Sequence, residues 1–221
     1  MRARQFRNVL VDATAVIIGN GPSLDNTPLE ALSKKYVTFG SNQIYRLPFT
    51  PTYYSFADSK HLGLLPLPED FKPRAMFCRA EACIPDNVPI YPIAWPGFST
   101  DIENFVVFGA SATYVLLQIA MYMGVNTVLL VGVDHYYPVA GEKDPGKMYT
   151  AGKTDPDHFT CGDGQGYCVE GVQYCRPSLD AVIPYYENAE SIFRANGRKI
   201  VNCTPGTHLE IFEKGNIEDW L

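Results

Sequence analysis

The segment Gly109–Gly124 constrains the fold most, because its residues are apolar on almost every side of a helix. Ser111 suits the N-cap of that helix and Gly124 suits its C-terminal stop. A helix without a polar face must be buried. A short apolar run, Thr127–Val131, follows and ends at Gly132-Val133-Asp134. The pattern predicts a buried helix that leads into the central strand of a sheet.

The N-terminal part of the chain shows the same order of elements. Ala15–Gly19 is a β-branched apolar run that ends in a glycine-rich turn. We expect a helix at roughly Asn26–Lys35 and further strands at Tyr36–Gly40 and Tyr53–Ala57. Strand, glycine turn, helix and strand in this order open a parallel α/β sheet.

The C-terminal part predicts one more helix and one more strand. Tyr185, Ala189, Ile192 and Phe193 recur at helical spacing, and Gly197 closes the helix. Pro184 marks its start or a kink, because proline cannot donate a backbone hydrogen bond. Lys199–Asn202 reads as a last parallel strand. Two shorter strand candidates, Ala75–Cys78 and Pro89–Pro92, lie in the proline-rich middle.

These elements predict one Rossmann-like α/β domain over residues 1–221, with a doubly wound, mainly parallel sheet. Residues 1–14 carry three arginines and read as a basic N-terminal tail, and no secretory signal or transmembrane run is evident. Residues 137–176 have little periodicity. A stretch of that length in a compact domain suggests a lid loop after the central strand.

Composition narrows the function classes. Hydrophobic residues make up 46% and charged residues 19%, which excludes a disordered chain. The formal net charge of -6 argues against a broad nucleic-acid-binding surface, although a single nucleotide needs only a local pocket. The composition does not decide whether the chain forms a homo-oligomer.

The six cysteines are too few for a disulfide scaffold. Cys161, Cys168 and Cys175 recur every seven residues, which is not the spacing of common zinc sites. Reduced thiols in a cytoplasmic protein are the preferred reading, with a loop disulfide or an incidental metal as rivals. We expect these three thiols to be unnecessary for folding.

The turn Gly19-Asn20-Gly21-Pro22-Ser23 is the first candidate binding feature, because glycines let a ligand approach the backbone. No Gly-Lys-Ser/Thr follows, so it is not a Walker loop. Leu24 and Asp25 stand where the dinucleotide fingerprint has its third glycine. The alternative is a tight turn with a purely structural role.

Polar residues also follow the other predicted strands. They are Asn42, Asp58 and the run Asp134-His135-Tyr136. The carboxyl ends of parallel strands meet at one edge of a sheet, where such folds bind ligands. We therefore expect these side chains to line one pocket, although each alone is more often a turn residue.

The long loop contains Asp155-Pro156-Asp157-His158. A histidine beside carboxylates suits general acid–base chemistry, because imidazole titrates near neutral pH. It also suits a divalent cation. A solvated Asx-Pro turn is the alternative. His208 has no acidic neighbours in the sequence and is expected to be structural.

These residues resemble a known family. Ile17–Leu24 followed by Gly40–Tyr45 looks like the opening of the 6-hydroxymethylpterin diphosphokinase MptE-like family. The same opening occurs in Rossmann-like bacterial sialyltransferases and in motility accessory factors that modify flagellin. The block Gly109–Tyr137 resembles the second hallmark of that group, and Asp157-His158-Phe159 fits a subgroup associated with surface glycans.

The sialyltransferase resemblance implies a CMP-activated sialic-acid-like sugar and a small-molecule or glycan acceptor. It implies that His158 is the catalytic base and that Tyr136 contacts the leaving phosphate. Asp157, the carboxylate next to His158 in the sequence, is expected to orient the ring. The nucleotide-binding residues that the resemblance implies are Asn20, Gly21, Ser23, Asn42, Gly109, Ala110 and Ser111, with Asp58 where that group carries an asparagine. The glycine turn and the strand end add Gly19, Pro22 and Asp134 to the expected nucleotide site.

The MptE resemblance implies a different reaction, in which ATP and Mg²⁺ transfer a diphosphate to a pterin. Asp58, Asp134, Asp155 and Asp157 would then supply metal ligands. A third class is a nucleotide- or glycan-binding module without catalysis.

Overall fold

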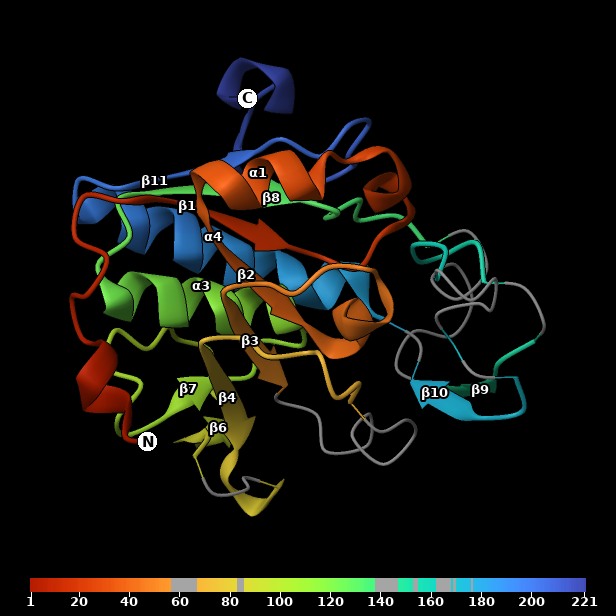
Figure 1. The fold of residues 1–221 in the computed structure, drawn as a ribbon, viewed down its shortest axis with the longest axis horizontal. Coiled ribbons are helices and arrows are strands. Elements are labelled where there is room, and N and C mark those ends of the chain that lie inside the picture. The colour runs from red at the N-terminus through yellow and green to blue at the C-terminus, as the bar shows by residue number, and fades with distance from the viewer. Residues whose placement is uncertain are drawn as a thin grey trace.

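The computed structural model describes residues 1–56, 67–82, 86–137, 147–152, 155–161, 168, 170–175 and 177–221. Its centre is an eight-stranded sheet in the order β12-β11-β8-β1-β2-β3-β4-β5, and every neighbouring pair is parallel (Figure 1). The strands are β1 (Thr14–Ile18), β2 (Val37–Ser41), β3 (Tyr53–Phe56), β4 (Ala75–Arg79), β5 (Val88–Ile90), β8 (Thr127–Val131), β11 (Lys199–Asn202) and β12 (Glu213–Lys214).

The strand order reverses at β1. The chain moves outward from β1 through β2, β3, β4 and β5, then returns to place β8, β11 and β12 on the other side of β1. Val131 at the end of β8 lies opposite Ile18 at the end of β1. In open parallel sheets the crevice at such a switch point is where ligands bind.

Helices cover both faces of the sheet, which confirms the doubly wound α/β prediction. The helix α1 (Leu29–Lys35) lies on one face, and α3 (Ala112–Met123) and α4 (Leu179–Ala195) lie on the other (Figure 1). Alternate residues of each strand enter two separate cores. Ile17 joins the α3 and α4 side, whereas Val16 joins the α1 side. This alternation explains the fully apolar strands, since both faces are buried.

The buried helix α3 forms as predicted, with Ser111 at its N-cap and Gly124 in the left-handed region at its C-cap. Gln118, the polar residue within it, is fully buried. Its side-chain oxygen accepts hydrogen bonds from the Ser99 and Val107 N–H groups at 3.0 and 2.8 Å. Val107 belongs to β7 (Val106–Val107), which pairs with β6 (Pro92–Ile93). Gln118 thus fixes the strand that leads to the α3 N-terminus.

The first helix begins later than predicted. The segment Pro22–Asn26 forms a short 3-10 helix, η2, and α1 begins at Leu29 rather than Asn26. Pro28 separates the two, because the residue before a proline is disfavoured in the helical region. The further 3-10 segments are η1 (Ala3–Phe6), η3 (Asn42–Arg46), η4 (Ala80–Ala82) and η5 (Ile217–Trp220).

The last helix also differs from prediction at its start. The helix α4 begins at Leu179, so Pro184 lies inside it, which excludes the start of the helix and leaves the predicted kink as the alternative. Ser178 occupies the N-cap position, and Gly197 follows the helix in the left-handed region as predicted. Within the described residues, none of the helices has the length and apolarity needed to cross a membrane.

The segment expected to be a basic tail packs against the sheet. Its 3-10 helix buries Ala3 and Phe6. The Phe6 ring centroid lies 5.3 Å from that of Phe77 on β4 and 6.1 Å from that of Tyr53 on β3. The N-terminus therefore contributes to the core on the α3 side.

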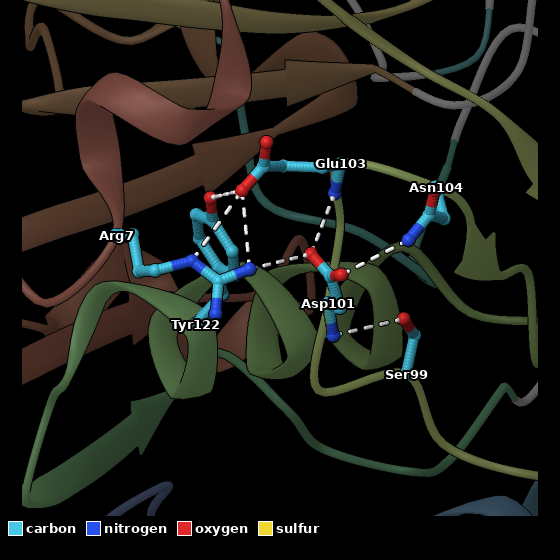
Figure 2. Close-up of polar contacts among 6 residues, drawn as sticks. All are labelled: Arg7, Ser99, Asp101, Glu103, Asn104 and Tyr122. Atoms are coloured by element: carbon cyan, nitrogen blue, oxygen red, sulfur yellow. Dashed lines mark hydrogen bonds and ion pairs between the residues drawn. The ribbon is translucent and has the colours of Figure 1, made fainter.

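A polar cluster holds the same segment to the loop before β7 (Figure 2). Arg7 Nη2 lies 3.0 Å from Asp101 Oδ1 and 3.1 Å from Glu103 Oε1. The Tyr122 hydroxyl on α3 donates to the same Glu103 oxygen at 2.7 Å. Asp101 in turn accepts from the Asn104 side chain at 3.0 Å. The arginine thus ties the N-terminus to α3 and its preceding loop.

The packing of Phe6 should contribute more to the free energy of unfolding than the ion pairs of Arg7. We expect Phe6→Ala to lower the free energy of unfolding by about 3 kcal/mol, since it removes a buried ring. Arg7→Gln should have a smaller effect that shrinks in high salt, because exposed ion pairs are screened. Urea unfolding at low and high salt measures both. A larger loss for Arg7→Gln than for Phe6→Ala would contradict this account.

Candidate functional site

A cavity of about 540 Å³ opens at the carboxyl ends of β1 and β8. This volume is in the range of small-ligand sites. Its walls come from the turn after β1, the N-terminus of α3, the loop after β8, the small antiparallel sheet of β9 (Met148–Thr150) and β10 (Gln173–Cys175), and the start of α4. The cavity therefore lies at the switch point of the sheet.

Most of the predicted site residues meet there. The cavity is lined by Gly19, Asn20, Gly21, Asn42, Ala110, Ser111, Asp134, Tyr136, Asp157 and His158. Pro22, Ser23 and Gly109 are neighbours of lining residues without lining it themselves. Asp58 lies outside the described residues.

The glycines of the first turn are required by the approach of β8. A Cβ on Gly19 would lie 2.2 Å from the Gly132 carbonyl oxygen, and one on Gly21 would lie 1.9 Å from Asp134 Oδ2. The Gly21 N–H donates to the Gly132 carbonyl at 2.9 Å. The sequence argument assigned these glycines to ligand approach, whereas the contacts of a Cβ here are with the protein itself.

Asp134 stabilises this turn through hydrogen bonds to Ser23. Its Oδ2 accepts from the Ser23 hydroxyl at 2.8 Å, and its Oδ1 accepts from the Ser23 N–H at 3.2 Å. Burial raises the pKa of Asp134, and the two bonds from Ser23 oppose that rise. Both carboxylate oxygens are thus engaged in holding η2 against β8.

Strained backbone gathers around the cavity. Six non-glycine residues have positive φ within the described chain, and three of them, Asn42, Ala110 and His135, line the cavity at φ 53°, 55° and 54°. Each left-handed residue costs about 1–2 kcal/mol. Such strain clusters at functional sites, where surrounding contacts enforce it.

The N-terminus of α3 offers a place for an anion. The Ser111 hydroxyl lies 2.9 Å from the Tyr186 hydroxyl and does not cap the helix. The first N–H groups of a helix have no partner within the helix, and the helix dipole is positive there. Ala112 and Thr113, in that first turn, line the cavity.

His158 pairs with Asp155, not with Asp157 as predicted. His158 Nδ1 lies 3.0 Å from Asp155 Oδ1 and 3.1 Å from Oδ2. Asp157 is buried and donates its backbone N–H to Asp155 Oδ1 at 3.2 Å. Asp155 and His158 are three positions apart, and the turn between them places the Asp155 carboxylate beside the His158 ring.

Asp155 is held as a carboxylate. Burial acts to raise its pKa, but the His158 contact and the Cys168 N–H, which donates at 2.8 Å, hold that pKa at about 2. Only 6% of the Asp155 side chain and 15% of the His158 side chain are exposed. A carboxylate on Nδ1 fixes the tautomer of the imidazole and leaves Nε2 as the nitrogen able to take a proton.

His208, which was expected to be structural, packs beside a predicted site residue. Its ring stacks on Tyr136, with centroids 4.8 Å apart and planes at 12°, and its backbone N–H donates to the Asp134 carbonyl at 2.9 Å. His208 follows β11, so the rule that singled out residues at strand ends also applied to it. His208 itself is not among the lining residues, whereas Tyr149 and Tyr186 line the cavity and were not predicted.

The described part of the cavity wall is aromatic and carries few charges. The described lining residues include Asp134 and Asp157 but no lysine or arginine. Among the described residues, Asp155, His158 and Cys168 bring together three side chains that can ligate a metal. Of the aspartates suggested as magnesium ligands, Asp155 belongs to this cluster, Asp134 is bonded to Ser23, and Asp58 lies outside the described residues.

The three loop thiols have different environments. Cys161 and Cys168 are buried, whereas Cys175 is exposed. Their burial revises the expectation that all three thiols are unnecessary for folding. We now expect Cys161→Ser and Cys168→Ser each to lower the free energy of unfolding by about 1–3 kcal/mol, since a hydroxyl is costlier to bury than a thiol. Cys175→Ser should be neutral. Urea unfolding in reducing buffer measures this, and equal losses at Cys175 and Cys161 would contradict it.

Comparisons with known proteins give a match in structure. No protein-family model matches the chain, and no curated protein sequence matches it either. The structure resembles the sialyltransferase CstII from Campylobacter jejuni, solved in complex with a substrate analogue, cytidine-5′-monophosphate, with a TM-score of 0.50 and 14% identity. The match covers 92% of this chain and 85% of that one.

At this identity the likeness shows the fold alone. It agrees with the sialyltransferase part of the sequence resemblance at that level. The MptE-like part has no matching family model or curated sequence.

Proposed function

We propose that this protein is a glycosyltransferase that uses a CMP-activated, sialic-acid-like sugar to build a surface glycan. The observation that carries the proposal is the His158–Asp155 pair in the wall of a cavity at the switch point of the sheet. The fold shared with a CMP-bound sialyltransferase supports the choice of donor.

In this proposal His158 is the general base. Asp155 holds the ring through Nδ1, and Nε2 removes the proton from an acceptor hydroxyl. The acceptor oxygen attacks the anomeric carbon as the bond from that carbon to the phosphate oxygen breaks. The electron pair leaves with CMP, and the configuration at the carbon inverts.

The remaining predicted residues would hold the donor. The first turn of α3 would meet the phosphate through its backbone N–H groups. Tyr136, stacked on His208, would donate its hydroxyl to the departing phosphate. Asn20 and Asn42 would contact the nucleoside, since both line the cavity. Much of the predicted lid, residues 137–176, lies outside the described residues, and its described strands β9 and β10 form one wall of the cavity.

Charge favours this donor over ATP. A CMP-sugar carries one negative charge on its phosphodiester, which helix N–H groups and hydroxyls can satisfy. Phosphoryl transfer from ATP relies on lysine or arginine together with Mg²⁺. The described lining residues include no lysine or arginine, and this observation favours the CMP-sugar over ATP.

A ligand screen tests the proposal. We expect CMP and CDP to raise the melting temperature of the full chain without Mg²⁺, and ATP to have little effect with or without it. Stabilisation by ATP that requires Mg²⁺ would favour the diphosphokinase. Binding of CMP without turnover of any CMP-sugar would favour a binding module.

A further inference from the structure

The loop that carries His158 brings three different donor atoms together. The ligating atoms of Asp155, His158 and Cys168 all lie within 4.8 Å of one another. Ligands of a tetrahedral zinc ion are about 3.3–3.7 Å apart, as bond lengths of 2.0–2.3 Å require. Small side-chain adjustments would therefore bring the three atoms to that geometry.

The chemistry of the donor set selects the metal. A carboxylate oxygen, an imidazole nitrogen and a thiolate sulfur together suit Zn²⁺, which accepts all three. Mg²⁺ prefers oxygen ligands alone. This donor set thus differs from the all-aspartate magnesium site that the sequence suggested.

The cluster is built into the fold and partly shielded from solvent. The Cys168 N–H donates to Asp155 Oδ2 at 2.8 Å, which holds the thiol beside the carboxylate. The Tyr149 hydroxyl lies 3.4 Å from Cys168 Sγ. Cys168 is 6% exposed, so a cation there would lie among desolvated ligands.

The cluster also meets the cavity. His158 and Cys168 line its wall, whereas Asp155 lies behind them. Zinc sites that keep one open position have three protein ligands and take water or a substrate atom as the fourth.

We propose that Asp155, His158 and Cys168 form a zinc-binding site whose fourth position opens into the cavity. The Cys168 thiol loses its proton to solvent when the metal binds. The metal would take up Asp155 and a nitrogen of His158. If the proposed function holds, zinc would therefore compete with the base and inhibit transfer.

The test is Co²⁺ binding by the reduced full chain, followed by displacement with Zn²⁺. The wild-type chain should bind one Co²⁺ with a thiolate-to-metal absorption band that Zn²⁺ abolishes. Cys168→Ser should lose the band. Its affinity should fall by more than the roughly 10–100-fold that accompanies loss of a residue that merely orients a ligand.

Cys175→Ser is the matched control, because Cys175 also lines the cavity but is not in the cluster. It should keep the band. No thiolate band in the wild-type chain, or a band that survives in Cys168→Ser, would overturn the site. The spectrum needs no turnover, so failure of the glycosyltransferase proposal would leave this result intact.

Discussion

Replacing His158 with alanine is expected to lower turnover of a CMP-sugar by roughly two to four orders of magnitude. Affinity for CMP should stay near normal, since the base meets the acceptor and not the nucleotide. Steady-state kinetics and CMP titration of the same preparation measure the two effects separately. Transfer at the wild-type rate by His158→Ala would remove the assignment of the base.

The carboxylates beside His158 make this test sharper. Asp155 contacts Nδ1 at 3.0 Å, whereas Asp157 touches Asp155 through its backbone N–H. Asp155→Asn should cost roughly two or more orders of magnitude in turnover, because an amide can favour the wrong tautomer. Asp157→Asn, the matched control, should cost less. The reverse order would restore the assignment first made from sequence.

Replacing Gly21 with alanine should destabilise the fold by about 1–3 kcal/mol, because the new Cβ would lie 1.9 Å from Asp134 Oδ2. Gly152→Ala is the control, since a Cβ there meets nothing within 4 Å. Urea unfolding measures both variants.

A double substitution identifies the cause. In Gly21→Ala/Asp134→Ala the clash with the carboxylate is gone, so the combined loss should be smaller than the sum of the single losses. Additive losses, or a stable Gly21→Ala chain, would contradict the packing of this turn against β8. A valine at Gly21 would therefore report on folding as well as on ligand access.

Much of the fold follows from local patterns. Apolar β-branched runs predicted β1 and β8 because both faces of the sheet are covered. Ser111 and Gly124 bounded α3 correctly. The break before Leu29 was also readable, because Pro28 disfavours helix at the residue before it. The start of α4 was not, since Pro184 tolerates a position inside the helix.

The sequence could predict those site residues whose positions follow from the strand topology. Strand ends gather at one edge, so Asn20, Asn42 and Asp134 were placed together correctly. Contacts within the long loop depend on its tertiary path. Sequence adjacency favoured Asp157 as the partner of His158, but the turn brings Asp155 to the ring instead.

The association of Cys168 with these residues has the same origin. It lies ten positions beyond His158, and its place beside Asp155 comes from a backbone hydrogen bond. Spacing rules for paired cysteines could not find it, because the neighbouring ligands are a carboxylate and an imidazole.

The most direct test of the central claim is release of CMP from a CMP-activated sialic acid by the wild-type chain in the presence of a metal chelator. We expect CMP to form, faster when an acceptor sugar is present, with His158→Ala slower by roughly two to four orders of magnitude. No release of CMP with any acceptor tested, together with no measurable binding of CMP, would contradict the proposed glycosyltransferase activity.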